Sequence, residues 1–158
     1  MNQIVHADKY DRAYDKTALQ FHPDGRVLMV EYAKGAVSKG EPIVGCRCSD
    51  GVIIVCVRKA PMSKFLVRPV QKVFPMERHI VVAATGLLFD AQKLLNQAQR
   101  RCLLHKNDFD ETIPVEMLCE YLSSTLHRHT TGSGRPFGVG LLVAGYDKEL
   151  GPQLYQVP

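Results

Sequence analysis

The sequence predicts one α+β domain, in which antiparallel strands come first and helices cover a face of the sheet. Short apolar runs bounded by turn residues predict four strands between residues 42 and 84. Apolar residues at helical spacing then predict helices from about 87 to 106 and from Pro114 onward. Two more strands follow at 137–145 and 153–157. Because strands and helices come in blocks, we expect antiparallel pairing, and 158 residues suit one domain.

The segment before these strands predicts a tail, a tight turn and a helix. Residues 1–13 mix charged and polar side chains with little periodicity, so we expect a flexible terminus. Pro23-Asp24-Gly25 is typical of a turn, because Pro presets φ and Gly accepts a positive φ. Apolar residues at three- and four-residue spacings then predict a helix over about 27–39. Gly40 and Pro42 end it.

The first predicted strand pair indicates how the sheets and helices are layered. Residues 42–48 and 52–58 flank the turn Ser49-Asp50-Gly51 and predict a hairpin. Residues 53–57 are apolar without alternation, so we expect this strand to be covered on both faces. A second pair is predicted at 70–74 and 79–84, around a turn at 76–78. The sequence stops at Pro158 directly after a strand, which is abrupt for a complete domain and leaves two alternatives open, a shortened chain or part of a longer one.

Composition argues against several classes of function. Net charge is +4, from 20 basic and 16 acidic residues that are mostly interspersed, so nucleic-acid binding has little support. No segment has the length and apolarity of a membrane span, and residues 1–13 have no signal-peptide core. Five cysteines, an odd number, favour a reduced, intracellular, soluble protein.

Three of the cysteines raise the question of a metal site. Cys46 and Cys48 point to one face of a predicted strand, and Cys56 lies on its partner. A zinc site needs three or four suitably spaced ligands, and no Cys-x-x-Cys or nearby His supplies the rest. We therefore favour buried, reduced cysteines and expect neither a metal nor a cofactor.

A long N-terminal pattern resembles a known family. It comprises Tyr14-Asp15-Lys16, Phe21-His22-Pro23-Asp24-Gly25-Arg26, Val30-Glu31-Tyr32-Ala33 and Ala36-Val37. The similarity continues through Val44-Gly45, Asp50-Gly51-Val52, Ser63-Lys64, Lys72-Val73-Phe74, Gly86-Leu87, Arg135-Pro136-Phe137-Gly138, Gly145-Tyr146-Asp147 and Leu154-Tyr155-Gln156. From Tyr14 onward, the chain is similar to proteasome α-type subunits.

The resemblance implies a fold and a set of partners. The family fold is the Ntn-hydrolase sandwich, a four-layer αββα arrangement. Its α-type members form the seven-membered outer rings of the 20S core particle, contact the β-ring subunits, close the axial pore with their tails and dock regulatory particles. The resemblance therefore implies a role in ubiquitin-dependent protein degradation in the cytoplasm and nucleus, with no nucleic acid or membrane as partner. It does not identify which of the seven α positions this chain takes.

The same resemblance bears on catalysis. The related β-type subunits cleave peptides with an N-terminal threonine, assisted by an acidic residue and a lysine. Here Gly40 is followed by Glu41, and the acidic position holds Val57, so only Lys72 has a counterpart. We expect no catalytic residue; the alternative, a threonine-type peptidase, is disfavoured by the missing threonine.

Family positions also identify a candidate gate. Tyr14 and Asp15 match the pair that holds the open pore through contacts between neighbouring subunits, since a phenol and a carboxylate can share a charge-assisted hydrogen bond. Pro23 matches the proline of the turn that moves on opening, and Tyr32 a tyrosine that braces the open state. Lys16 departs from the Arg often found in the family and loses its planar fork.

A second set of positions predicts a binding pocket. Lys72 matches the lysine that receives an activator's C-terminal carboxylate between α subunits. Gly40 and Gly86 would permit close backbone approach, and Leu87 would form an apolar wall. Without the resemblance, an ordinary surface lysine at a strand edge would be the simpler interpretation of Lys72.

Overall fold

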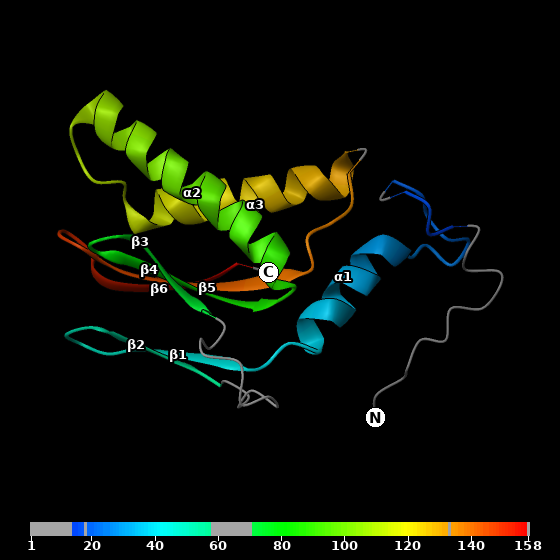
Figure 1. The fold of residues 1–158 in the computed structure, drawn as a ribbon, viewed down its shortest axis with the longest axis horizontal. Helices are drawn as coiled ribbons and strands as arrows, with labels where there is room; N and C mark the ends of the chain where they lie inside the picture. The colour runs from blue at the N-terminus through cyan, green and yellow to red at the C-terminus, as the bar shows by residue number, and fades with distance from the viewer. Residues whose placement is uncertain (1–13, 18, 58–70, 133, 158) are drawn as a thin grey trace, which may run out of the picture.

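The computed structural model describes residues 14–17, 19–57, 71–132 and 134–157. The predicted tail, residues 1–13, lies outside them. The described elements, in chain order, are α1 (Leu28–Ser38), β1 (Ile43–Arg47), β2 (Val52–Cys56), β3 (Val73–Glu77), β4 (Ile80–Gly86), α2 (Leu88–Phe109), α3 (Val115–Thr131), β5 (Val139–Asp147) and β6 (Gly151–Val157) (Figure 1). This α+β composition confirms the predicted fold class.

A four-stranded antiparallel sheet forms the centre of the molecule. Its order is β3-β4-β5-β6, so every strand pairs with the next one along the chain, and α2 and α3 form the connection between β4 and β5. The register between β4 and β5 pairs Ile80 with Gly145 and Gly86 with Val139. A register shift between Pro75 and Glu77 extends β3, so the turn that we predicted at 76–78 lies at residues 78–79.

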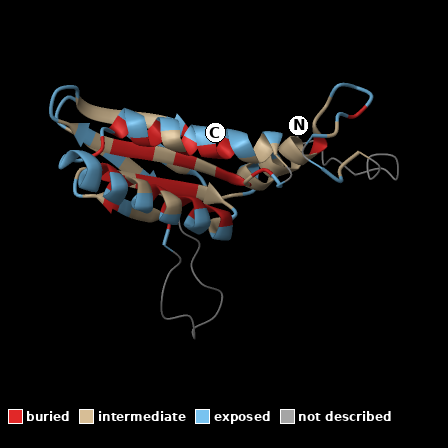
Figure 2. Ribbon diagram, turned by 90° about the horizontal axis from the view of Figure 1, so that it is seen from above, coloured by how far each residue is buried: buried red, intermediate tan, exposed pale blue. Residues whose placement is uncertain are grey.

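Helices α2 and α3 cover one face of this sheet (Figure 1). The predicted stripe on α2 is buried at Leu94, Leu95, Ala98 and Cys102. On α3, Leu118, Leu122 and Leu126 are buried in the same cluster, which also includes inward-facing residues of β4 and β5. Figure 2 shows the buried positions concentrated on the strands and on the helix sides that face them. Removing this apolar surface from water stabilises the domain.

Strands β1 and β2 form a separate antiparallel hairpin on the other face of the sheet (Figure 1). Its inner face packs closely, since a Cβ on Gly45 would lie 3.1 Å from a methyl group of Leu154 and 3.4 Å from one of Leu142. Its outer face is uncovered by the described residues: Ile53 and Val55 are each 59% exposed. The prediction that this strand is covered on both faces is therefore wrong for the described structure.

The described residues form three of the four predicted layers: the α2–α3 layer, the four-stranded sheet and the hairpin. The second helical layer of the sandwich is not among them. Helix α1, predicted at about 27–39, lies at one end of the sheets and packs beside β4 and β5. Its predicted apolar stripe is half-buried, and Leu28 is its one fully buried residue.

Candidate functional site

The four predicted pocket residues come from different elements. Gly40 follows α1, Lys72 precedes β3, Gly86 ends β4, and Leu87 is the N-cap of α2. Gly40 approaches Gly86 closely enough that a Cβ on Gly40 would lie 2.6 Å from the Gly86 nitrogen. The backbone carbonyl of Lys72 accepts a hydrogen bond of 2.9 Å from Ala84 in β4. The structure therefore brings the predicted residues to one corner, where β4 leads into α2.

Lys72 is buried, with 7% of the residue exposed. Its ammonium forms an ion pair with the carboxylate of Glu41 and donates a hydrogen bond of 3.0 Å to the carbonyl oxygen of Val57. A buried cation needs such partners, because leaving water without them costs several kcal/mol. The simpler interpretation, an ordinary surface lysine, does not describe this residue.

The two glycines are required by geometry. Gly86 has φ +96°, a region that L-residues with a side chain rarely adopt, and a Cβ there would collide with the carbonyl oxygen of Gly138. A Cβ on Gly40 would collide with the hydroxyl of Thr85. That hydroxyl donates a hydrogen bond of 2.8 Å to the carbonyl oxygen of Glu41. Small residues at both positions thus allow the chain after α1 to lie against the end of β4.

Leu87 contributes both a backbone contact and exposed apolar surface. Its N–H donates a hydrogen bond of 2.8 Å to the carbonyl oxygen of Gly138. Its side chain packs over Gly138, where an added Cβ would lie 3.0 Å from a Leu87 methyl group. The residue remains 46% exposed. This geometry fits the predicted apolar wall, whose binding role stays a prediction.

An ion pair that we did not predict from the sequence stabilises the loop beside Leu87, at the start of α2. The carboxylate of Asp90, in the first turn of α2, accepts two hydrogen bonds from the Arg135 guanidinium, at 2.8 and 2.6 Å. It also accepts one of 3.1 Å from the Gly138 N–H. Burial raises the pKa of this carboxyl, but the Arg135 and Gly138 hydrogen bonds outweigh it, and the net pKa is lowered. The pair fixes the loop whose Gly138 carbonyl supports Leu87.

The predicted gate residues lie around the turn before α1. His22 accepts a backbone hydrogen bond of 2.8 Å from Gly25, its N–H donates one of 2.8 Å to Arg26, and Gly25 has φ +77°. Pro23 occupies the exposed second position of this turn. The Tyr14 ring lies edge-on to the His22 ring, with centroids 5.3 Å apart. The turn therefore carries Pro23 and Tyr14 in one compact unit.

A second ion pair connects this turn to α1. The Arg26 guanidinium donates two hydrogen bonds to the Glu31 carboxylate, one of them 2.8 Å long, and the hydrogen bond to Arg26 lowers the pKa of Glu31. Tyr32, on α1, and Asp15 are both half-buried. The predicted Tyr14–Asp15 contacts join neighbouring subunits, so the roles of Asp15 and Tyr32 stay predictions.

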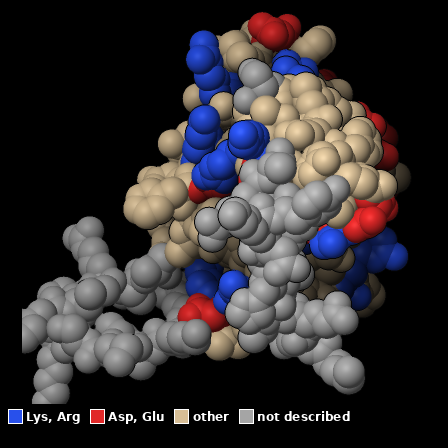
Figure 3. Space-filling model, turned by 90° about the vertical axis from the view of Figure 1, so that its right-hand side faces the viewer, with Lys and Arg blue, Asp and Glu red and all other residues tan. Residues whose placement is uncertain are grey.

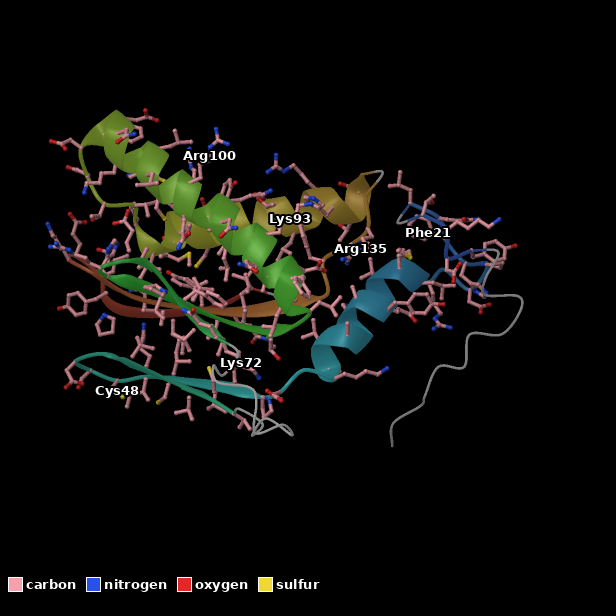
Figure 4. All side chains as sticks on the ribbon, viewed as in Figure 1. Phe21, Cys48, Lys72, Lys93, Arg100 and Arg135 are labelled. Carbon is pink, nitrogen blue, oxygen red and sulfur yellow. The ribbon has the colours of Figure 1, made fainter. Side chains whose placement is uncertain are left out.

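The two predicted sites lie at opposite ends of α1. Figure 4 shows Phe21, in the turn region, beyond one end of the helix and Lys72 beyond the other. A helix of 11 residues is about 16 Å long. The structure thus groups the pocket residues together and the turn residues together, but keeps the two groups apart.

The cysteines differ from the prediction. Cys102 and Cys119 are buried, but Cys46 and Cys48 are exposed on the hairpin. The expectation that these hairpin cysteines are buried is therefore wrong for the described structure, because the outer hairpin face has no cover there. Within the described ranges, no group of three His, Cys, Asp or Glu side chains is placed to hold a metal ion. In the same ranges, no helix is long and apolar enough to cross a membrane.

Comparison with known proteins agrees with this arrangement. The family model described as proteasome subunit matches residues 37–158, most of the chain. The chain belongs to the proteasome subunit family. It is 36% identical over 137 residues to the proteasome subunit alpha of Methanocaldococcus jannaschii, which covers 86% of this chain and 52% of that protein. The proteasome subunit alpha of Pyrobaculum aerophilum is 36% identical over 144 residues, 90% of this chain and 59% of its own length.

These relatives confirm the resemblance to α-type proteasome subunits that the N-terminal pattern predicted. The chain spans about half the length of the curated relatives it matches. The described layers accordingly correspond to part of the family sandwich.

Proposed function

We propose that this chain is a non-catalytic α-type subunit of the proteasome core particle, which assembles into the outer ring and contributes to gating and to docking of regulatory particles. The observation that carries the proposal is the unbroken path from α1 through Gly40 and Glu41 into β1. A catalytic β-type relative would expose its threonine amine at this point. Here the Glu41 backbone is internal, and its carboxylate pairs with Lys72.

The surroundings of Lys72 support the absence of catalysis. A threonine mechanism needs a nucleophile, a free amine and an acidic partner beside the lysine. Val57, at the acidic position, accepts a hydrogen bond from Lys72 at its carbonyl oxygen, and the residue is 49% exposed. Lys72 therefore has no threonine nucleophile at position 41 and no acidic partner at position 57 for a threonine mechanism, and its proposed role is to bind the C-terminal carboxylate of a regulatory particle.

Substituting Lys72 tests the docking role. In core particles reconstituted with the full-length subunit, Lys72→Met keeps most of the side-chain volume and removes the charge. We expect peptide hydrolysis stimulated by an activator's C-terminal peptide to fall by about tenfold or more, because a charge-assisted contact is lost. Lys93→Met is the matched control, because Lys93 lies on α2 outside the pocket (Figure 4). Unchanged stimulation by assembled Lys72→Met particles would contradict the pocket assignment.

The gating role rests on the rigid turn that follows the tail. Pro23 fixes one backbone angle of this turn, and the Arg26–Glu31 pair connects the turn to α1, so the turn has a fixed position relative to that helix. Deleting residues 1–13 should raise basal peptide hydrolysis by the assembled core. No rise would indicate that this tail is not among those that close the pore.

The remaining partners follow from the same proposal. Neighbouring α subunits would share the seven-membered ring, β subunits would lie beneath it, and the particle would work in ubiquitin-dependent degradation in the cytoplasm and nucleus. The face of the molecule in Figure 3 carries basic and acidic side chains in separate small groups. This distribution gives no support to a nucleic-acid partner.

A further inference from the structure

The Glu41 carboxylate is paired with the Lys72 ammonium, the same group that a ligand of the proposed pocket would need to bind. Lys72 and Glu41 form their ion pair with side chains 8% and 21% exposed, respectively. An ammonium has three N–H donors, and the described residues supply two acceptors, Glu41 and the Val57 carbonyl. Among the described residues, Glu41 is the anion paired with Lys72.

The backbone of Glu41 is held in place independently of that ion pair. Thr85 donates a hydrogen bond of 2.8 Å to the Glu41 carbonyl oxygen, and the adjacent Gly40 packs against Gly86. Because the backbone is already fixed, only the Glu41 side chain is ordered when the pair forms. An internal carboxylate of this kind competes effectively with one that arrives from solution.

We propose that Glu41 is a built-in competitor for Lys72, so that a ligand ending in a carboxylate must displace the Glu41 side chain to bind. The inference rests on the proposed function, in which Lys72 receives the C-terminal carboxylate of a regulatory particle. Glu41 then sets the affinity of the pocket, and it favours ligands whose other contacts compensate for the displaced ion pair.

If Glu41 instead positions Lys72, removing Glu41 should change the ligand affinity in the opposite direction. If Glu41 served to orient Lys72, its removal would weaken ligand binding. The structure favours competition, because burial of the lysine and the 3.0 Å hydrogen bond to Val57 already orient the ammonium. Removing the Glu41 charge leaves a buried cation that an incoming carboxylate can neutralise.

The experiment compares Glu41→Gln with the unmodified subunit in reconstituted core particles. Glutamine keeps the shape and one acceptor oxygen while removing the charge. The probe is a synthetic peptide of an activator's C-terminal residues with a free carboxylate, and the same peptide ending in an amide is the reference. We expect the free-acid peptide to bind roughly three- to tenfold more tightly to Glu41→Gln particles, and the amide to change little.

Three further variants make the result decisive. Glu120→Gln changes the same charge on the exposed face of α3 and should leave both affinities unchanged. Glu41→Ser also removes the carboxylate and should tighten binding as Glu41→Gln does, which guards against poor assembly of one variant. Adding Lys72→Met to Glu41→Gln should abolish the gain.

Two failures are distinguishable. Unchanged or weaker binding of the free acid to Glu41→Gln and Glu41→Ser particles would overturn the competitor role. Unchanged binding of the free acid to particles carrying Lys72→Met alone would instead overturn the proposed pocket.

Discussion

Strands β4 and β2 are both apolar, but the structure treats them differently. In β4, Ile80 and Val82 are fully buried between neighbouring strands and under the helices. In β2, Ile53 and Val55 are more than half exposed on the outer hairpin face. The difference shows that an apolar strand sequence predicts surfaces that are stabilised by burial, but does not show which residues bury them.

The family fold contains more helical structure than the described residues, and such structure could bury the outer face of the β1–β2 hairpin. The αββα sandwich predicted from the family has two helical layers, of which the described residues form one, and the chain spans about half the length of the curated relatives it matches. An exposed apolar face of this kind is typical of an interaction surface or of an aggregation-prone fragment.

The largest contrast is expected between two isoleucines. Ile80→Ala should lower the free energy of unfolding by about 2–5 kcal/mol, since it removes fully buried methyl groups and leaves a cavity. Ile53→Ala, at 59% exposure, should cost under about 1 kcal/mol in the same chain. Urea denaturation of both variants measures the difference. Equal losses would contradict the assignment of the core.

Two glycines give the next contrast. Gly86→Ala should cost about 2 kcal/mol or more, because φ +96° is unfavourable with a side chain and the new Cβ meets Gly138. Gly51→Ala, in the hairpin turn, meets no atom within 4 Å and should cost under about 1 kcal/mol. Thermal unfolding compares them, and a tolerated Gly86→Ala would refute the described geometry of the pocket corner.

The Asp90–Arg135 pair should give a smaller, pH-dependent effect. Asp90→Asn should cost about 1–3 kcal/mol at neutral pH, because Arg135 and Gly138 lose a charged acceptor. The pKa of Asp90 is lowered in the folded state, so its contribution is complete above the unfolded value of about 3.9 and disappears as pH falls through the lower folded value. The two proteins should therefore converge in stability in strong acid. A difference that is constant with pH would show that the carboxylate charge is not responsible.

Cysteine reactivity contrasts the two regions without changing stability. Burial raises the pKa of Cys102 to about 11 and that of Cys119 to about 12, so their thiols should resist alkylation in the folded chain. Cys46 and Cys48 are exposed and should react first, although the neighbouring Cys46 raises the pKa of Cys48. Mass spectrometry after brief alkylation gives the order. Faster labelling of Cys119 than of Cys46 would contradict the described burial of these two cysteines.

Sequence patterns predicted the features that depend on neighbouring residues. Apolar spacing located α2 and α3, and Pro23-Asp24-Gly25 predicted a turn whose Gly25 indeed has a positive φ. Pairs distant in sequence were missed: Glu41 and Lys72 are 31 residues apart, and Asp90 and Arg135 are 45 apart. No local period indicates that such charges will meet, because the sheet topology brings them together.

The exposure of the hairpin could not be predicted for a different reason. The non-alternating run at 53–57 correctly indicated two apolar faces. Only the structure showed that the described residues cover one of them. The same reason explains the error for Cys46 and Cys48, which are exposed in this hairpin.

The most direct test of the central claim is native purification of the tagged full-length protein, followed by treatment with a threonine-directed covalent inhibitor and intact-mass analysis of every subunit. A non-catalytic ring subunit predicts recovery in a particle of core size. Its chain should keep the residues before Glu41 and remain unlabelled, while other subunits take up the inhibitor. Recovery only as a free monomer, or a chain processed to a new N-terminus and labelled, would contradict the account.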